Sequence, residues 1–155
     1  MWEAVSSGRI DYVSSDHAPS TRAQKSGNSI WEAPFGLPGI DTTSAVLLDG
    51  ANAGRLTYER VVEVYAEGPA RIYGLARKGR LVPGADADVS VVDPAAAWTV
   101  SDDDILSRAG WSPFSGRTLR GRPIRTYVRG QLVALHGAVC ANPGVGQFVP
   151  GPGAA

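Results

Sequence analysis

Apolar residues in the first half of the chain follow helical spacing, interrupted by one short extended run. Residues 10–14 form that run, which has the length and composition of a buried strand. Thr42 or Thr43 is placed to cap a helix that ends near Asn52. A second helix is predicted to begin after Thr57, where valine and tyrosine side chains recur on one face. The first half therefore predicts helices that pack beside a strand.

The second half of the chain changes to short β runs separated by glycine and proline. Gly68 is predicted to end the second helix, and Pro69 to open a short third one. The predicted β runs are residues 81–82, 89–92, 124–128 and 132–135. Ser101 begins a capping-box pattern that predicts a short helix between them. Arg129-Gly130 separates the last two runs and predicts a hairpin.

The change of pattern near residues 74–80 divides the chain into an α/β unit and a β unit. The expected boundaries are residues 1–76 for the first unit, 77–138 for the second and 139–155 for a tail. The tail combines many glycines and prolines with few large apolar residues, so disorder is expected there. The fold class predicted for the whole chain is α/β.

Composition argues against several classes of partner. The 155 residues carry 15 basic and 15 acidic side chains, and no basic stripe suggests nucleic acid. No apolar run approaches the ~20 residues of a membrane span, and the first residues lack the pattern of a signal peptide. Cys140 is the single cysteine, so an internal disulfide is impossible, and the reducing cytoplasm is the expected location.

Asp16 is the candidate for chemistry, because Ser15-Asp16-His17-Ala18-Pro19 directly follows the run at residues 10–14. A carboxylate at the end of a strand can coordinate a metal cation and accept a proton from water that the metal activates. The alternative is that Asp16 caps the following turn through its own backbone. On this short motif alone, the capping role is the favoured interpretation.

Further motifs, taken with the Asp16 segment, resemble the C-terminal part of the cyclic amidohydrolases, the family of dihydroorotase, allantoinase and hydantoinase. The motifs are Ala33-Pro34-Phe35-Gly36-Leu37-Pro38-Gly39-Ile40 and the segments 78–94, 112–117 and 126–130. They extend to about Leu135, and their order makes a catalytic role the better interpretation of Asp16. The resemblance implies a C-terminal fragment of a metal-dependent-hydrolase TIM barrel, its last strand and helices, plus part of a small β-sandwich.

The resemblance also implies roles for the residues around Asp16. In the family, the matching aspartate binds one of two zinc ions and shuttles a proton. His17 does not occupy a ligand position of the family; it is expected to orient the loop or to meet the substrate, together with Ser20, Pro38 and Gly39. Ser20 departs from dihydroorotases, which commonly have a second histidine there. Allantoin, hydantoins and other cyclic amides therefore remain open as substrates.

Most of the metal ligands of the family have no counterpart in this sequence. The chain contains no His-x-His pair, and its two histidines are His17 and His136. The family also uses a carbamylated lysine that bridges the metals and two further histidines. A catalytic zinc needs about three protein ligands. The chain alone is therefore expected to bind zinc in less than stoichiometric amounts.

Two hypotheses about function follow. In the first, the chain is the C-terminal part of a cyclic amidohydrolase that acts on a cyclic amide or ureide and needs the missing N-terminal portion. In the second, it is a non-catalytic remnant or an interaction module of the same fold. A complete small binding protein is disfavoured, because the helix at residues 2–7 starts in the middle of its pattern. Helix faces without partners predict self-association or docking of the missing portion.

Overall fold

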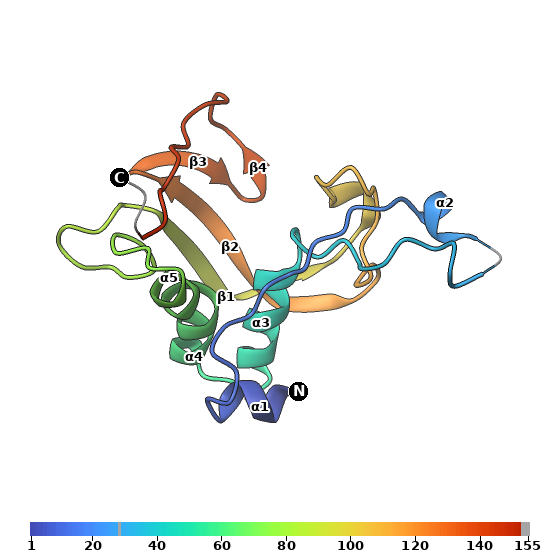
Figure 1. Ribbon diagram of the computed structural model, residues 1–155, viewed down its shortest axis with the longest axis horizontal. Coiled ribbons are helices and arrows are strands. Elements are labelled where there is room, and N and C mark those ends of the chain that lie inside the picture. Colours follow the sequence, from blue (N-terminus) through green and yellow to red (C-terminus); the bar gives the residue numbers. More distant parts are fainter. Residues whose placement is uncertain (28, 153–155) are drawn as a thin grey trace.

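A four-stranded antiparallel sheet and a group of short helices make up the computed structural model, which describes residues 1–27 and 29–152 (Figure 1). The strands, in sheet order, are β1 (Val89–Thr99), β2 (Thr118–Val128), β3 (Gln131–Leu135) and β4 (Ala138–Val139). The α-helices are α1 (Trp2–Ser6), α2 (Arg22–Lys25), α3 (Thr43–Asn52), α4 (Tyr58–Val62) and α5 (Gly68–Ile72). A π-helical turn, η1 (Glu63–Glu67), joins α4 to α5, and a 3-10 turn, η2 (Asp102–Asp104), follows β1.

The sheet is built from two hairpin-like pairings around β2. β1 pairs with β2 from Val89 opposite Tyr127 to Thr99 opposite Thr118, with irregularities in register on either side of residues 92–93. The predicted turn at Arg129-Gly130 is confirmed: it joins β2 to β3, and both residues have positive φ, 52° and 79°. Two positive φ angles suit the twist of a tight hairpin. The β unit expected from the sequence is therefore present, with longer strands than its apolar runs.

The core forms where α3 packs on β2. Figure 1 shows α3 and α4 side by side next to the sheet, and α3 contacts both β2 and α4. Gly121 of β2 has φ of 93°, and a Cβ on it would lie 2.6 Å from the Cβ of Leu48. The helix thus lies directly on the strand backbone. One buried cluster comprises Val5, Leu47, Leu48, Leu56, Val61 and Val64, and a second comprises Ala45, Val100 and Leu119.

The sequence predicted that the second helix ends at Gly68 and that Pro69 opens a short helix. A short helix, α5, does begin there with Pro69 in its first turn, but no break separates it from the preceding turn. Instead, the Gly68 amide donates to the carbonyl of Glu63, five residues back, and the chain continues into α5. Pro69 has no N–H and cannot complete an α-helical ladder, so a widened turn forms in front of it. The Val64 carbonyl accepts a hydrogen bond from the Val13 amide, 2.9 Å away.

Residues 10–14 are not assigned as a strand, contrary to the sequence prediction. Among the described residues, the backbone bond from Val13 to Val64 holds this segment, but no neighbouring strand pairs with it. Arg60 adds support: its guanidinium donates to the Val5 carbonyl at 2.7 Å and to the Ile10 carbonyl at 2.5 Å. A ladder of backbone hydrogen bonds defines a strand, so an apolar extended run without a partner does not become one. The predicted run at residues 81–82 is also irregular.

The end of the chain turns back toward α5. Val139, assigned to the tail from the sequence, is the second residue of β4. Residues 140–152 follow without helix or strand, and a Cβ on Gly74 would lie 2.7 Å from the ring of Pro152. The remaining tail positions, 153–155, for which disorder was expected, lie outside the described residues. No helix in the described part of the chain is both long and apolar enough to cross a membrane.

Candidate functional site

The segment that carries Asp16 lies alongside the glycine- and proline-rich residues 36–40. His17 and Leu37 form a parallel β-bridge, and the Ala18 amide donates to the Leu37 carbonyl at 3.0 Å. Gly36 has φ of 79°, and a Cβ there would lie 2.6 Å from the Cβ of Ala18. A glycine is therefore required for the two segments to approach this closely. The two motifs quoted from the sequence thus lie side by side in the structure.

Asp16 presents an exposed carboxylate from a left-handed turn with φ of 44°. Aspartate is among the few residue types that tolerate this backbone region. Within residues 1–27 and 29–152, no hydrogen bond or ion pair of its side chain is found, including the bond to its own turn that a capping role requires. The arrangement leaves both carboxylate oxygens available to a ligand from outside.

His17 is partly buried, and both of its ring nitrogens face groups of the chain. Nδ1 accepts hydrogen bonds from the amides of Gly39 at 3.2 Å and Ile40 at 3.3 Å. Nε2 lies 3.4 Å from the hydroxyl oxygen of Ser107. The imidazole therefore connects the Asp16 segment to residues 36–40 and to the segment after η2.

Pro38 and Gly39 join the Asp16 segment to the start of α3. Pro38 is buried, and a Cβ on Gly39 would lie 3.2 Å from the Ser15 carbonyl oxygen. The Gly39 carbonyl accepts a bond from the Thr43 hydroxyl at 2.7 Å and from the Thr43 amide at 3.0 Å. Thr42, expected as a capping residue, makes no side-chain cap bond to the helix. The turn before α3 is thus fixed on both sides.

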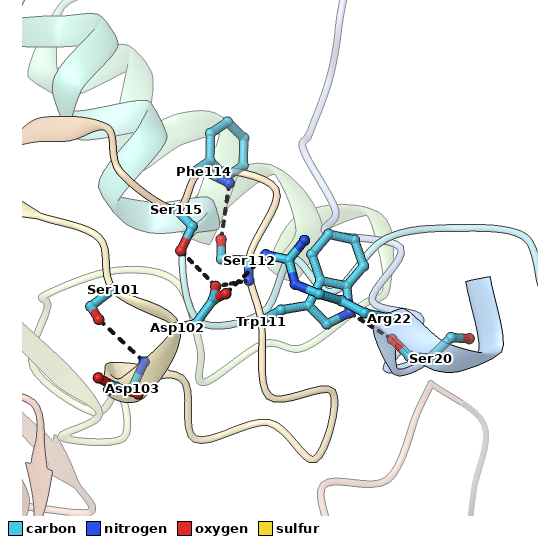
Figure 2. Close-up of polar contacts among 9 residues, drawn as sticks. All are labelled: Ser20, Arg22, Ser101, Asp102, Asp103, Trp111, Ser112, Phe114 and Ser115. Atoms are coloured by element: carbon cyan, nitrogen blue, oxygen red, sulfur yellow. Dashed lines mark hydrogen bonds and ion pairs between the residues drawn. The ribbon is translucent and has the colours of Figure 1, made fainter. Parts of the chain in front are cut away.

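Ser20 lies farther along the same loop and has different neighbours. Its carbonyl accepts a 2.8 Å hydrogen bond from the indole Nε1 of Trp111, and its amide donates to Ala18. The contacts of this residue thus run to the segment after β1, not to residues 36–40. In Figure 2, the indole of Trp111 points toward Ser20. The structure therefore brings Asp16, His17, Pro38 and Gly39 together and holds Ser20 by a separate anchor.

Asp102 organises a polar network that the sequence did not predict (Figure 2). Its carboxylate accepts from the Ser115 hydroxyl at 2.5 Å, from the Arg22 guanidinium at 2.8 Å and from the Ser112 amide at 3.0 Å. These bonds, led by that from Ser115, lower the pKa of the Asp102 carboxyl to about 2. The Arg22 guanidinium also lies 4.9 Å from the ring centroid of Trp111. The network fastens α2 to the segment that the resemblance identified at 112–117.

Asp86 and Asp88 hold the β unit together through ion pairs. The side chain of Asp86 is 6% exposed and lies 2.8 Å from Arg77 and 2.9 Å from Lys78. Lys78 also pairs with Asp88, whose carboxylate accepts from the amide of Arg129 at 2.7 Å. Hydrogen bonds that Lys78 donates lower the pKa of both carboxyls. The same bonds, first that to Asp88 and then that to Asp86, raise the pKa of Lys78. These aspartates fix the β2–β3 turn and are engaged with cations of the chain.

The described part of the chain does not gather a set of metal ligands of its own. Residues 1–27 and 29–152 contain no group of three or more His, Cys, Asp or Glu side chains that could hold a metal ion. His136, the second histidine, lies in an exposed turn between β3 and β4. Asp16 can therefore supply one carboxylate to a metal centre whose other ligands come from elsewhere.

Comparisons of the sequence with known proteins all identify amidohydrolases as its relatives. The amidohydrolase family model matches residues 1–133. The chain is 46% identical over 133 residues to a dihydroorotase of Halobacterium salinarum, covering 86% of this chain and 31% of that protein. It is 38% identical over 153 residues to an L-hydantoinase of Paenarthrobacter aurescens, covering 96% of this chain and 33% of the other. An allantoinase of Rubrobacter xylanophilus is 37% identical over 150 residues, with 96% and 33% covered.

Solved structures resemble the chain over the same extent. The L-hydantoinase from Arthrobacter aurescens superposes with a TM-score of 0.89 at 38% identity, covering 96% of this chain and 34% of that one. A D-hydantoinase from Thermus sp. gives 0.88 at 31% identity, with 96% and 33% covered. The chain thus spans about a third of the length of the relatives it matches.

Proposed function

Because the chain belongs to the amidohydrolase family, we propose that it is the C-terminal part of a metal-dependent enzyme that hydrolyses a cyclic amide or ureide C–N bond. The observation that carries the proposal is the exposed carboxylate of Asp16, held without an internal partner beside residues 36–40. The relatives named dihydroorotase, hydantoinase and allantoinase support this class of substrate.

The fold assigned to the complete protein is a TIM barrel with an attached β-sandwich. Residues 1–76 would form the last strand and helices of the barrel, residues 77–138 part of the sandwich, and residues 139–155 a tail. Residues 10–14 support this assignment, because they are extended and lack neighbouring strands in the described chain. Neighbours supplied by the missing portion would complete the ladder and place Asp16 at the carboxyl end of a barrel strand, where such enzymes carry their catalytic groups. The single Cys140 supports a cytoplasmic location.

Zinc is the proposed metal, and Asp16 the residue of this chain that would hold it. An exposed carboxylate free of internal partners fits one ligand position of a zinc centre. The remaining ligands would come from the missing portion, since no three-residue ligand group occurs in the described part of the chain. When bound, zinc would lower the pKa of the water that it coordinates, so that this water can lose a proton near neutral pH.

The residues of this chain would then handle the proton and the substrate. Asp16 accepts the proton that the attacking water loses as its oxygen bonds to the amide carbon. The same carboxyl returns that proton to the ring nitrogen as the C–N bond breaks, so that the proton is conserved. The backbone of Pro38 and Gly39 forms a wall against which the ring amide is oriented, with Ser20 and His17 at its margins.

A chimera tests the proposal. In the L-hydantoinase of Paenarthrobacter aurescens, the matched third is replaced by this chain, which is 38% identical to it. The expected protein binds two zinc ions and hydrolyses hydantoin, whereas the chain alone retains well under one equivalent of zinc after dialysis. Asp16→Ala should lower kcat roughly 10³-fold, the scale of an acid–base group.

Asp103→Asn is the matched control, because Asp103 is also exposed and its carboxylate contacts none of the proposed site residues. Full activity of the Asp16→Ala chimera would remove Asp16 from the mechanism. A folded chimera that binds two metals but hydrolyses no cyclic ureide would instead favour the non-catalytic remnant or interaction module.

A further inference from the structure

We propose that His17 is a positioning residue, held as the neutral tautomer with its proton on Nε2, that fixes residues 36–40 against the Asp16 segment. Its effect on catalysis rests on the proposed function. The tautomer and the anchoring rest on the geometry of the chain alone and can be tested without activity.

The assignment of the tautomer follows from the donors around the ring. The amides of Gly39 and Ile40 both direct their hydrogens at Nδ1, at 3.2 and 3.3 Å. A backbone N–H can only donate, so Nδ1 must offer its lone pair and cannot carry a proton. A neutral imidazole then carries its proton on Nε2, which lies 3.4 Å from Ser107 Oγ and can donate to it.

The same contacts occupy Nδ1 of His17, so this nitrogen is not available to a substrate or a metal. Substrate binding through Nδ1 would take the acceptor away from the amides of Gly39, which is partly buried, and Ile40, and each lost hydrogen bond has a cost. Metal binding through Nδ1 is opposed for the same reason. The substrate-binding role predicted for this residue is therefore replaced here by support of the wall that Pro38 and Gly39 form.

His17 lies between Asp16 and residues 36–40, so its contacts affect how these two parts of the proposed site are placed. The residue directly follows Asp16, whose backbone is left-handed, and it pairs with Leu37 in a β-bridge. On the other side of the turn, the Gly39 carbonyl accepts hydrogen bonds from the amide and the hydroxyl of Thr43 at the start of α3. A ring that binds Gly39 and Ile40 therefore sets the distance between the proposed proton carrier and the proposed substrate wall.

The first test uses the chain itself, labelled with ¹⁵N. Long-range ¹H–¹⁵N correlation spectra at neutral pH should show His17 as a single tautomer, with Nδ1 unprotonated and Nε2 protonated. His136 provides the internal reference, because it is exposed in a turn and neither of its ring nitrogens makes a hydrogen bond in the described part of the chain. A His136→Asn spectrum assigns the two rings. An averaged ring at His17, or one protonated at Nδ1, would overturn the proposal.

The second test separates the acceptor from the bulk of the side chain. His17→Asn places an oxygen acceptor near the position of Nδ1, whereas His17→Leu fills similar space without one. Amide hydrogen exchange at Gly39 and Ile40 should accelerate about tenfold or more in His17→Leu, the scale of one lost hydrogen bond, and much less in His17→Asn. Equal exchange in both variants would overturn the anchoring role.

The chimera then reports on catalysis. His17→Leu should raise KM for hydantoin about tenfold with both metals retained, and His17→Asn should restore most of the loss. Unchanged KM in His17→Leu would refute the positioning of the wall. An inactive parent chimera would count against the proposed function only, since the tautomer and amide exchange of the chain would still decide the role of His17.

Discussion

Replacement of Gly68 by alanine tests how closely the helical segment and residues 10–14 are fitted to each other. Gly68 has helical dihedral angles, with φ of −57°, so alanine is not disfavoured by its backbone. Its added Cβ, however, would lie 2.4 Å from the Asp11 carbonyl oxygen and 2.8 Å from that of Glu63. Ordinary contacts begin at 3.4 Å, so one of these backbones must retreat by about 1 Å. Both are backbone atoms, which cannot swing aside.

The net effect is the balance of three contributions. Alanine in a helix gains ~1 kcal/mol over glycine. Overpacking against a fixed backbone costs ~1–3 kcal/mol, and displacement of Asp11 strains the bond from Val13 to Val64, worth ~1 kcal/mol. We expect Gly68→Ala to lower the free energy of unfolding by about 2 kcal/mol.

Urea unfolding followed by tryptophan fluorescence measures this change. Gly50→Ala in α3 is the control, because its Cβ would meet the ring of Trp2 at 2.6 Å, a side chain on a terminal helix that can move. The control should stay within about 1 kcal/mol of the unmodified chain. A Gly68→Ala chain that is as stable as the parent, or more stable, would refute the close fit of these backbones.

Two further predictions concern charged groups. Asp102 has a lower pKa in the folded chain than its ordinary value of 3.8, so its contribution to stability is complete above about pH 4 and is lost as the pH falls to about 2. In Asp102→Asn, urea unfolding should depend less on pH in this interval; an unchanged dependence would contradict the network. Replacement of Arg60, which is 11% exposed, by methionine should lower the free energy of unfolding by about 3 kcal/mol, because two backbone carbonyls lose a charged donor. Glu63→Gln, which removes the charge of its half-exposed partner, should cost under about 1 kcal/mol in the same assay.

The family could be recognised from sequence because its motifs are local and ordered. The resemblance to the cyclic amidohydrolases is confirmed by the family match over residues 1–133 and by the named relatives. The helix after Thr42 and the turn at Arg129-Gly130 are also as predicted. Each depends on residues within a few positions, such as a pair that accepts positive φ. Local chemistry is therefore sufficient for these elements.

Features that depend on distant partners were not predictable. The apolar run at residues 10–14 indicates burial, but whether it joins a ladder depends on strands elsewhere. The π-helical turn required knowing that the Val64 carbonyl has a partner in Val13. Pro69 was correctly interpreted as lying in the first turn of a new helix, but it did not indicate the widened turn before it.

The candidate site divides in the same way. The family motifs assigned the Asp16 segment and residues 36–40 to one site, and the glycine at 36 permits their close approach. The hydrogen bonds of both ring nitrogens of His17 could not be predicted from the sequence, because Ser107 is 90 positions away. The Asp102 network likewise joins residues up to 80 positions apart. A capping pattern at Ser101 indicated only the local turn, in which its hydroxyl accepts from the Asp103 amide alone.

The widened turn at residues 63–67 makes the chain sensitive to its exact residue count. An α-helix advances 100° per residue, so loss of one residue from this turn would restore regular geometry and rotate everything before it relative to α5. Val64, fully buried, would leave the core, and its carbonyl would turn away from Val13. The extended segment that leads to Asp16 would then lose its backbone anchor. A frame-preserving deletion more than forty positions from Asp16 would thus act on the candidate site, although no residue of the site had been altered.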